Sequence, residues 1–233
     1  MCGRYSLTTP TEGLRALFGF DELPNLPPRY NIAPTQDVAA VRSSPDNGKR
    51  SFTLFRWGLI PSWAKDPSIG SKMINARAET VAEKPAYRAA FRRRRCLIPA
   101  DGFYEWEKRE DGGKQPWRIT LKEGGPFAFA GLWEDWLGAD GSEVETCTIV
   151  TTNAAPVIKR IHHRMPVILD PSDFDVWLSG EPEVAYELLR PFAGELDAYC
   201  VSTRVNNVRN DDRSLIDGEA APEPSAKAQL DLF

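Results

Sequence analysis

Residues 103–122 read FYEWEKREDGGKQPWRITLK, and the fold prediction for the whole chain starts from their pattern. Side chains alternate in residues 103–107 and again in 117–122, as they do in half-buried β-strands. Between the two runs, the turn signal Asp111-Gly112-Gly113 is of the kind that joins the strands of a hairpin. This stretch therefore predicts an antiparallel hairpin.

Strand-like runs dominate the rest of the chain, with few helices between them. The other strands are expected at 37–42, 51–57, 96–99, 127–133, 146–151, 166–169 and 198–204. Helices are expected after a capping box at Thr9–Glu12, ending at Gly19, and at 79–95, 171–179 and 182–190, with Asp170 as a cap. Because strands outnumber helices without βαβ alternation, we predict an α+β fold: one mainly-β domain with a few short helices.

The composition changes near residue 217. Residues 2–216 have the make-up of one ordinary folded domain, whereas residues 217–233 are poor in apolar residues and hold four acids and one lysine. We predict a domain over 2–216 and a disordered tail over 217–233.

Charge and cysteine usage narrow the class of protein. The net charge of −4 argues against a general polycation, although the run Arg92–Arg95 is either a solvated face or a phosphate-binding patch. Cysteines at positions 2, 96, 147 and 200 have no zinc-site spacing and indicate a reduced, cytoplasmic setting. No run is long and apolar enough for a membrane span, and no signal peptide is recognised.

Cys2 directly follows Met1, so the loss of one residue would give it a free α-amine next to its thiol. In unperturbed peptides these groups titrate near ~7.7–8.0 and ~8.5, so part of each is nucleophilic at neutral pH. An aldehyde can form an imine with such an amine, after which the thiol closes a five-membered thiazolidine. An interior cysteine cannot do this, although a cysteine at position 2 can also be accidental.

Two further segments carry polar side chains that core packing does not require. Asn75, Arg77 and Glu79 alternate along an extended segment and share one face, which suits a solvated strand edge or the wall of a polar pocket. Glu105 lies between two aromatic residues, where a carboxyl tends toward the raised pKa of a general acid. The alternative is an exposed strand glutamate.

The two histidines of the chain are adjacent, at His162 and His163, and Arg164 follows them. No Asp, Glu or Cys stands nearby at ligand spacing, so we predict no metal site but a general acid/base beside a phosphate-binding arginine. Trp57 and Trp63 flank a Gly/Pro turn; core packing explains one of them, and two suggest a stacking platform. The polar segment 201–207 is a candidate groove wall.

Together these segments resemble one family, the SRAP domain of abasic-site-processing (SOS-response-associated) proteins. The resemblance covers residues 2–216 and is carried in order by Met1–Arg4, Tyr30–Pro34, Arg56–Trp63, Asn75–Thr80, Cys96–Trp106, Thr151–Ala154, His162–Pro166 and Val201–Ser202. One position departs from the family pattern, because the residue after the family histidine is commonly Asp and here is His163. Whether His163 shares the role of His162 is left open.

The resemblance implies an enzyme of DNA damage repair that needs no cofactor. Cys2, exposed by loss of Met1, would crosslink as a thiazolidine to the ring-opened aldehyde of an abasic site in single-stranded DNA. Self-removal of Met1 would be a peptidase activity, and the DNA chemistry would be AP-lyase-like. Asn75 would position the amine and the substrate, Glu105 would move protons, and His162 would protonate the sugar oxygen and assist reversal.

The resemblance also implies a DNA-binding surface on a monomeric, nucleoid-associated protein. Its expected phosphate ligands and groove or stacking residues are Arg4, Arg77, Arg164, Trp57, Trp63 and Trp106. Two rival functions stay open. Class II glutamine amidotransferases also begin Met-Cys-Gly and use the cysteine for acyl transfer, but that likeness stops at three residues. A non-catalytic binding module is the other.

The last five residues, Gln229–Phe233, resemble the QLxLF peptide with which bacterial repair proteins dock on the sliding clamp. Leu232 and Phe233 are apolar anchors, Leu230 adds to them, and Gln229 offers amide hydrogen bonds. We expect the tail to tether the domain to the clamp, the alternative being a chance match of five residues.

Overall fold

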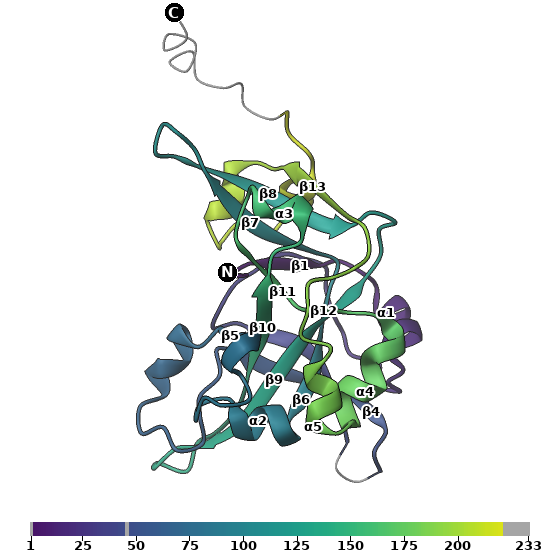
Figure 1. Cartoon of the computed structure of the whole chain (residues 1–233), viewed down its shortest axis with the longest axis vertical. Coiled ribbons are helices and arrows are strands. Elements are labelled where there is room, and N and C mark those ends of the chain that lie inside the picture. The colour runs from purple at the N-terminus through teal and green to yellow at the C-terminus, as the bar shows by residue number, and fades with distance from the viewer. Residues whose placement is uncertain (1, 45–46, 221–233) are drawn as a thin grey trace, which may run out of the picture.

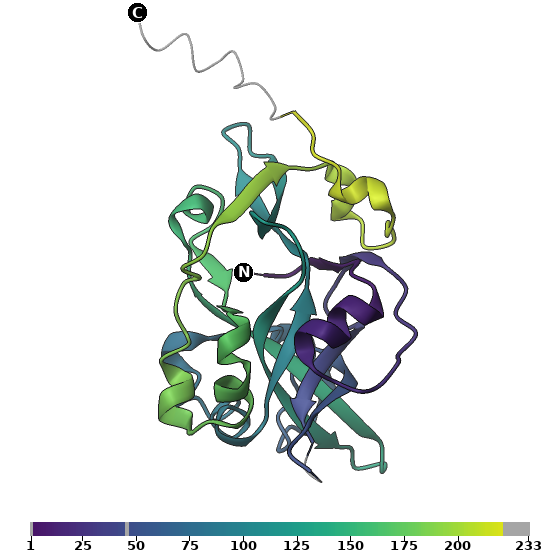
Figure 2. The ribbon, with the colours of Figure 1, turned by 90° about the vertical axis from the view of Figure 1, so that its right-hand side faces the viewer.

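The computed structural model describes residues 2–44 and 47–220, and these form a mainly-β α+β fold as predicted (Figures 1 and 2). Its centre is a long antiparallel pair, β9 (Phe127–Leu137) and β10 (Glu143–Asn153), of 11 residues each. Their alternation of buried and exposed residues at one end follows the period of a strand.

Five strands close into a barrel. Strand β10 pairs with β9 on one side and with β4 (Arg50–Trp57) on the other. The circuit runs on through β3 (Asp37–Ser43) and β6 (Arg95–Ala100) back to β9. All of these pairs are antiparallel except β4–β10, which is parallel. Closure leaves no unpaired edge between the five strands.

Short strands extend the barrel near its end. The antiparallel additions are β11 (Arg164–Pro166) on β10 and β12 (Ile168–Leu169) on β9. Strand β5 (Asn75–Arg77) pairs in parallel with β10 through Ile149–Thr151.

A second, five-stranded sheet lies at the top of the barrel in the view of Figure 1. Its order is β13 (Leu196–Cys200), β8 (Lys114–Leu121), β7 (Gly102–Lys108), β1 (Tyr5–Leu7) and β2 (Arg29–Ile32). The predicted hairpin of residues 103–122 is β7–β8, with Tyr104 opposite Arg118. Since β6 runs into β7 across Asp101, one segment belongs to both sheets.

The helices are short and lie outside the barrel strands. They are α1 (Thr11–Phe18), α2 (Arg88–Arg93), α3 (Pro156–Lys159), α4 (Phe174–Ser179) and α5 (Pro182–Tyr186). Asp170 caps the 3₁₀ turn η3 (Pro171–Asp173) before α4 by accepting from Ser172 N, as predicted. The helix predicted over 79–95 shrinks to α2, because Pro85 lies in its first half and disfavours helical geometry before it.

The capping box predicted at the start of α1 is wrong, although the glycine stop is confirmed. Pro10 occupies the N-cap position without a side-chain hydrogen bond, and Gly19 ends the helix at φ 72°. Thr9 does not cap the helix because its N–H and hydroxyl both face the Asp101 carboxylate.

The chain remains attached to the domain slightly beyond residue 216. Gly218 forms a bridge with Val201, and Glu219 N donates to Cys200 O at 2.9 Å. Residues 221–233, including Gln229–Phe233, lie outside the described residues. Within residues 2–44 and 47–220, none of the helices is long and apolar enough to cross a membrane.

A buried carboxylate, Asp101, fastens β1 to the corner between the two sheets. Asp101 Oδ1 accepts from Ser6 Oγ at 2.7 Å, and its Oδ2 accepts from Thr8 Oγ1 at 2.7 Å and from Thr9 N at 3.1 Å. The guanidinium of Arg118 pairs with the same carboxylate at 3.4 Å, and both side chains are about nine-tenths buried. This network fixes the register of the strand that follows Cys2.

We predict that Asp101→Ala lowers the free energy of unfolding by about 3 kcal/mol, because it leaves the buried Arg118 charge without its partner. Urea denaturation measures the change. Asp197→Ala, at an exposed carboxylate on β13, is the matched control and should stay within about 0.5 kcal/mol of the parent. Equal effects of the two substitutions would show that the Asp101 network does not stabilise the fold.

Candidate active site around Cys2

Cys2 lies where segments from both sheets meet. Strand β1 follows it, and Tyr104 N on β7 donates to Arg4 O at 2.9 Å, continuing the β1–β7 ladder toward the N-terminus. This register brings Glu105 beside the backbone of residues 2–3. The fold thus places Cys2 next to residues that are about 70 to 160 positions away in sequence.

Asn75 holds the backbone of Cys2. Its Nδ2 donates to Cys2 O at 2.8 Å, and β5 is fixed in turn by Tyr87, whose hydroxyl donates to Asn75 O at 3.2 Å. The Oδ1 of Asn75 is buried and has no hydrogen-bond partner among the described residues. A buried amide oxygen of this kind favours a donor, so it can receive an amine or a substrate hydroxyl.

Glu105 is buried, with 3% of its surface exposed. Burial raises the pKa of its carboxyl, and the charge of His163 partly offsets that effect. Burial also raises the pKa of the Cys2 thiol, and the neighbouring Glu105 raises it further. Glu105 is therefore a better proton donor than an exposed carboxyl, and once it has given up its proton it can take one from the neighbouring thiol.

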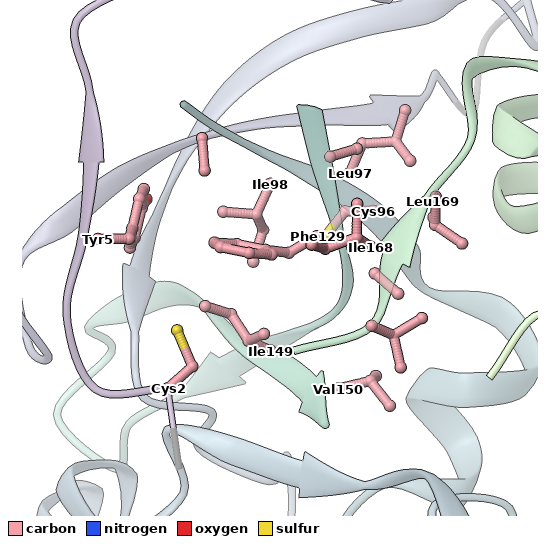
Figure 3. Packing of buried hydrophobic residues seen from close by; sticks show 14 of the residues in the cluster. Cys2, Tyr5, Cys96, Leu97, Ile98, Phe129, Ile149, Val150, Ile168 and Leu169 are labelled. Carbon is pink, nitrogen blue, oxygen red and sulfur yellow. The ribbon is translucent and has the colours of Figure 1, made fainter. Parts of the chain in front are cut away.

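The thiol of Cys2 points into the hydrophobic core. Cys2 has no exposed surface, and Figure 3 shows its sulfur directed toward the cluster that contains Tyr5, Phe129 and Ile149. An apolar environment of this kind keeps a thiol neutral and weakly reactive. Reaction with an aldehyde therefore requires a neighbouring base.

His162 and His163 occupy the loop between α3 and β11. His162 is half-buried, and its Nδ1 lies 3.0 Å from Arg164 N, which can donate to it. Burial is the largest cause that lowers the pKa of His162, so the imidazole is neutral at pH 7. His163 is exposed and stacks on His162 at 4.4 Å, which lowers the pKa of His163 through mutual repulsion.

Arg164 is held in a buried ion pair. Its guanidinium contacts both carboxylate oxygens of Glu79, the longer contact being 2.9 Å, and donates to Thr151 O at 2.5 Å. Only 10% of the side chain is exposed. This arrangement fixes the loop that carries His162, while phosphate binding by Arg164 stays a prediction.

The other two predicted phosphate ligands are better placed to meet an anion. Arg4 lies over the ring of Trp106 at 5.8 Å and donates to Asn31 Oδ1 at 2.8 Å and to Val205 O at 2.7 Å. Burial lowers the pKa of Arg4. Within residues 2–44 and 47–220, neither Arg4 nor the exposed Arg77 has a carboxylate at ion-pair distance. Both charges can therefore take an external anion.

The three predicted tryptophans differ in exposure. Trp57 is fully buried, donates from Nε1 to Ile74 O at 2.9 Å and packs edge-on against Tyr5, so it cannot offer a face to a base. Trp63 is 60% exposed and can. Trp106 is half-buried, and its Nε1 donates to Asn206 Oδ1 at 2.7 Å. Trp57 belongs to the core beneath the site.

Three residues that hold the backbone or side chains of the site in place were not identified from the sequence. Asn31 and Asp101 lie within segments that carry the family resemblance, but their spacing gives no chemical signal. Tyr87 lies outside those segments. No group of three or more His, Cys, Asp or Glu among the described residues is arranged to hold a metal ion. What the site offers is a thiol, a buried carboxyl with a raised pKa, a neutral imidazole and an amide oxygen.

Comparison with known proteins gives a consistent family. The sequence model of the family described as SOS response associated peptidase (SRAP) matches residues 1–208. The abasic site processing protein YoaM of Bacillus subtilis (strain 168) is 43% identical over 226 residues, covering 94% of this chain and 99% of that protein. The abasic site processing protein HMCES of Gallus gallus is 35% identical over 217 residues, covering 79% of this chain and 64% of that protein.

The fold also matches a solved structure. A crystal structure of a protein from Bacteroides thetaiotaomicron superposes with a TM-score of 0.84 at 28% identity. The match covers 94% of this chain and 100% of that chain. The arrangement of barrel and second sheet is therefore shared with that protein.

We predict that Glu105→Gln stabilises the protein at neutral pH. Because the pKa of Glu105 is higher in the folded chain than in the unfolded chain, its ionisation costs stability above the ordinary carboxyl pKa; below that pKa the cost disappears. Glu105→Gln should therefore raise the melting temperature at about pH 7.5 and change it little at about pH 4. Thermal denaturation at both pH values measures it.

The exposed Glu110→Gln is the control for loss of one negative charge. It should change the stability little at either pH. A destabilisation by Glu105→Gln at neutral pH would contradict a raised pKa of the buried Glu105 carboxyl.

Proposed function

Since the chain belongs to the SOS response associated peptidase (SRAP) family, we propose that it processes abasic sites in single-stranded DNA through Cys2. Removal of Met1 would leave Cys2 with a free α-amine, and the amine and thiol together would capture the aldehyde of the opened abasic sugar. The product is a thiazolidine that links protein and DNA and shields the lesion.

The observation that carries this proposal is the environment of Cys2. Asn75 binds its carbonyl, Glu105 lies beside its thiol with a raised pKa, and the His162 loop is held nearby by Arg164. Curated relatives that align over 94% and 79% of the chain are named abasic site processing proteins. An aldehyde is the reactive group that an N-terminal cysteine captures at both of its nucleophiles.

Glu105 can carry the protons needed for loss of water from the amine adduct and for closure of the thiazolidine. The amine of Cys2 adds to the aldehyde carbon, and Glu105 gives its proton to the resulting hydroxyl, which leaves as water and yields an iminium. The Glu105 carboxylate then takes the thiol proton while sulfur adds to the same carbon. Glu105 ends protonated, as it began, and the buried Asn75 Oδ1 can hold the amine throughout.

His162 suits the earlier step that makes the aldehyde available. A closed abasic sugar opens when its ring oxygen takes a proton and its hydroxyl loses one. The neutral imidazole of His162 can take the proton of the hydroxyl and, as the imidazolium, give it to the ring oxygen, and by the same path in reverse it can assist release of the crosslink. The stacked His163 is the candidate to share this role.

The finer activities follow from the same residues. Loss of Met1 by self-cleavage would be the peptidase activity for which the family is described, and imine chemistry at the sugar would give AP-lyase-like activity. Arg4 and Arg77 would bind the flanking phosphates, and Trp63 and Trp106 would contact bases. No observation favours glutamine hydrolysis, and the match to the SRAP family extends far beyond the three residues shared with amidotransferases.

We predict that Cys2→Ala abolishes the crosslink while leaving non-covalent DNA binding within about threefold, because phosphate and stacking contacts lie elsewhere. The assay mixes protein with uracil-glycosylase-treated single-stranded DNA and follows adducts by denaturing gel and intact mass. Cys200→Ala removes another buried thiol and is the control that should crosslink like the parent.

The outcomes separate the rival functions. A Cys2→Ala variant that crosslinks as well as the parent would refute the mechanism. Glutamine hydrolysis lost in Cys2→Ala would support the amidotransferase reading, and reversible binding without any adduct would support a binding module.

The tail would add a partner. We propose that Gln229, Leu230, Leu232 and Phe233 bind the bacterial sliding clamp, with the preceding residues linking them to the domain. A peptide of residues 222–233 should bind the clamp with modest affinity, because a disordered peptide loses entropy on docking. Isothermal titration calorimetry measures this, with a peptide carrying both Leu232→Ala and Phe233→Ala as the control. Equal binding by the two peptides, or no binding by either, would show that the clamp is not a partner of this tail.

A further inference from the structure

One buried amide, that of Asn31 on β2, connects several segments next to the site. Asn31 is 1% exposed. Its Oδ1 accepts from Arg4 Nη1 at 2.8 Å, and its Nδ2 faces three backbone carbonyls: Val205 at 3.3 Å, Asn207 at 3.1 Å and Asn210 at 2.7 Å. The amide oxygen of Asn31 therefore holds the Arg4 guanidinium, and its amide nitrogen holds the loop of residues 203–210.

The loop of residues 203–210 also contacts Trp106. Its 3₁₀ turn η4 (Thr203–Asn206) is packed down by Val205, which is fully buried. The same turn presents Asn206 Oδ1 to Trp106 Nε1 at 2.7 Å. The position of the Trp106 ring thus depends on the loop, and the loop depends on Asn31.

The main chain around Asn31 is itself anchored. Asp211 Oδ1 accepts from Tyr30 N at 2.5 Å and from Asn31 N at 3.1 Å, and Tyr104 donates its hydroxyl to Tyr30 O at 2.7 Å. The backbone of Asn31 is thus fixed by Asp211, and its side-chain amide is fixed at both ends by the contacts given above. It can therefore transmit a fixed geometry to the groups it contacts.

We propose that Asn31 is a positioning residue for DNA recognition, which sets the Arg4 guanidinium and the Trp106 ring in one register. The proposal rests on the function proposed above, in which Arg4 binds a phosphate. Arg4 and Trp106 face each other at 5.8 Å, and Asn31 reaches the first directly and the second through the loop. A phosphate on Arg4 and a base against Trp106 would then belong to neighbouring positions of one strand.

An amide is the side chain that this position requires. A carboxylate would accept from Arg4 but would face three carbonyl oxygens without a donor, and it would neutralise the cation that a phosphate needs. Asn31→Asp nearly keeps the shape and changes only these properties. It is therefore the sharpest substitution.

The test is a double-mutant cycle on DNA affinity. All proteins carry Cys2→Ala, and the probe is single-stranded DNA with a tetrahydrofuran abasic analogue, so that binding is reversible. We expect Asn31→Asp to raise the Kd about tenfold and to reduce the salt slope by about 0.7, the loss of one phosphate contact. In an Arg4→Gln background the same change should raise the Kd by clearly less than tenfold and leave the salt slope unchanged, because only the path through the loop and Trp106 remains.

Two controls separate positioning from stability. Asn207→Ala removes an exposed amide of the same loop, whose Oδ1 accepts from Arg209 N at 3.1 Å, and should leave the Kd unchanged. Asn206→Ala removes the Trp106 acceptor and should raise the Kd without changing the salt slope. Melting temperatures are recorded for every variant.

Each outcome decides between proposals. Equal fold changes in Kd for Asn31→Asp with and without Arg4→Gln would overturn the positioning role. If Arg4→Gln leaves the Kd and the salt slope unchanged, the phosphate assignment in the proposed function fails instead. Should Asn31→Asp not fold, Asn31→Ser enters the same cycle, and if neither folds, Asn31 is a stability residue and the proposal is withdrawn.

Discussion

The carboxylate of Asp101 is the point through which the two sheets and the N-terminal strand are held in one arrangement. It lies where β6 leaves the barrel and becomes β7. It accepts hydrogen bonds from Ser6 in β1 and from Thr8, which directly follows β1. A slip of β1 by one residue would turn every side chain of that strand to the other face. Because Cys2 lies three residues before β1, such a slip would also carry its thiol away from Glu105.

Much of the fold follows from local pattern, because the barrel strands are long enough to show their period. Strands β3, β4 and β7 begin and end within a residue or two of the prediction. Strands β1 and β2, by contrast, are three and four residues long and were not predicted. Such short strands exist because a partner strand and the Asp101 network hold them, and neither is visible in local sequence.

The site was predictable where chemistry depends on residue type and was not where it depends on burial. Cys2 and Glu105 attract attention as a nucleophile and as an acid among aromatic residues. Two tryptophans on one turn look alike in sequence, yet Trp57 is fully buried and Trp63 is 60% exposed, because only Trp57 faces the barrel core. Asn31 gives no signal at all, since a buried amide and a solvated one have the same letter.

The burial of Cys2 also depends on the order in which the chain is synthesised. Its thiol has no exposed surface once the fold is complete. During translation, however, Cys2 is made about 100 residues before Glu105 and about 160 residues before His162. At a translation rate of about 5–20 residues per second, roughly ten to thirty seconds pass before all of its neighbours exist. During that interval β9 and β10 are not yet in place to enclose the thiol of Cys2, so its burial is acquired only late in synthesis.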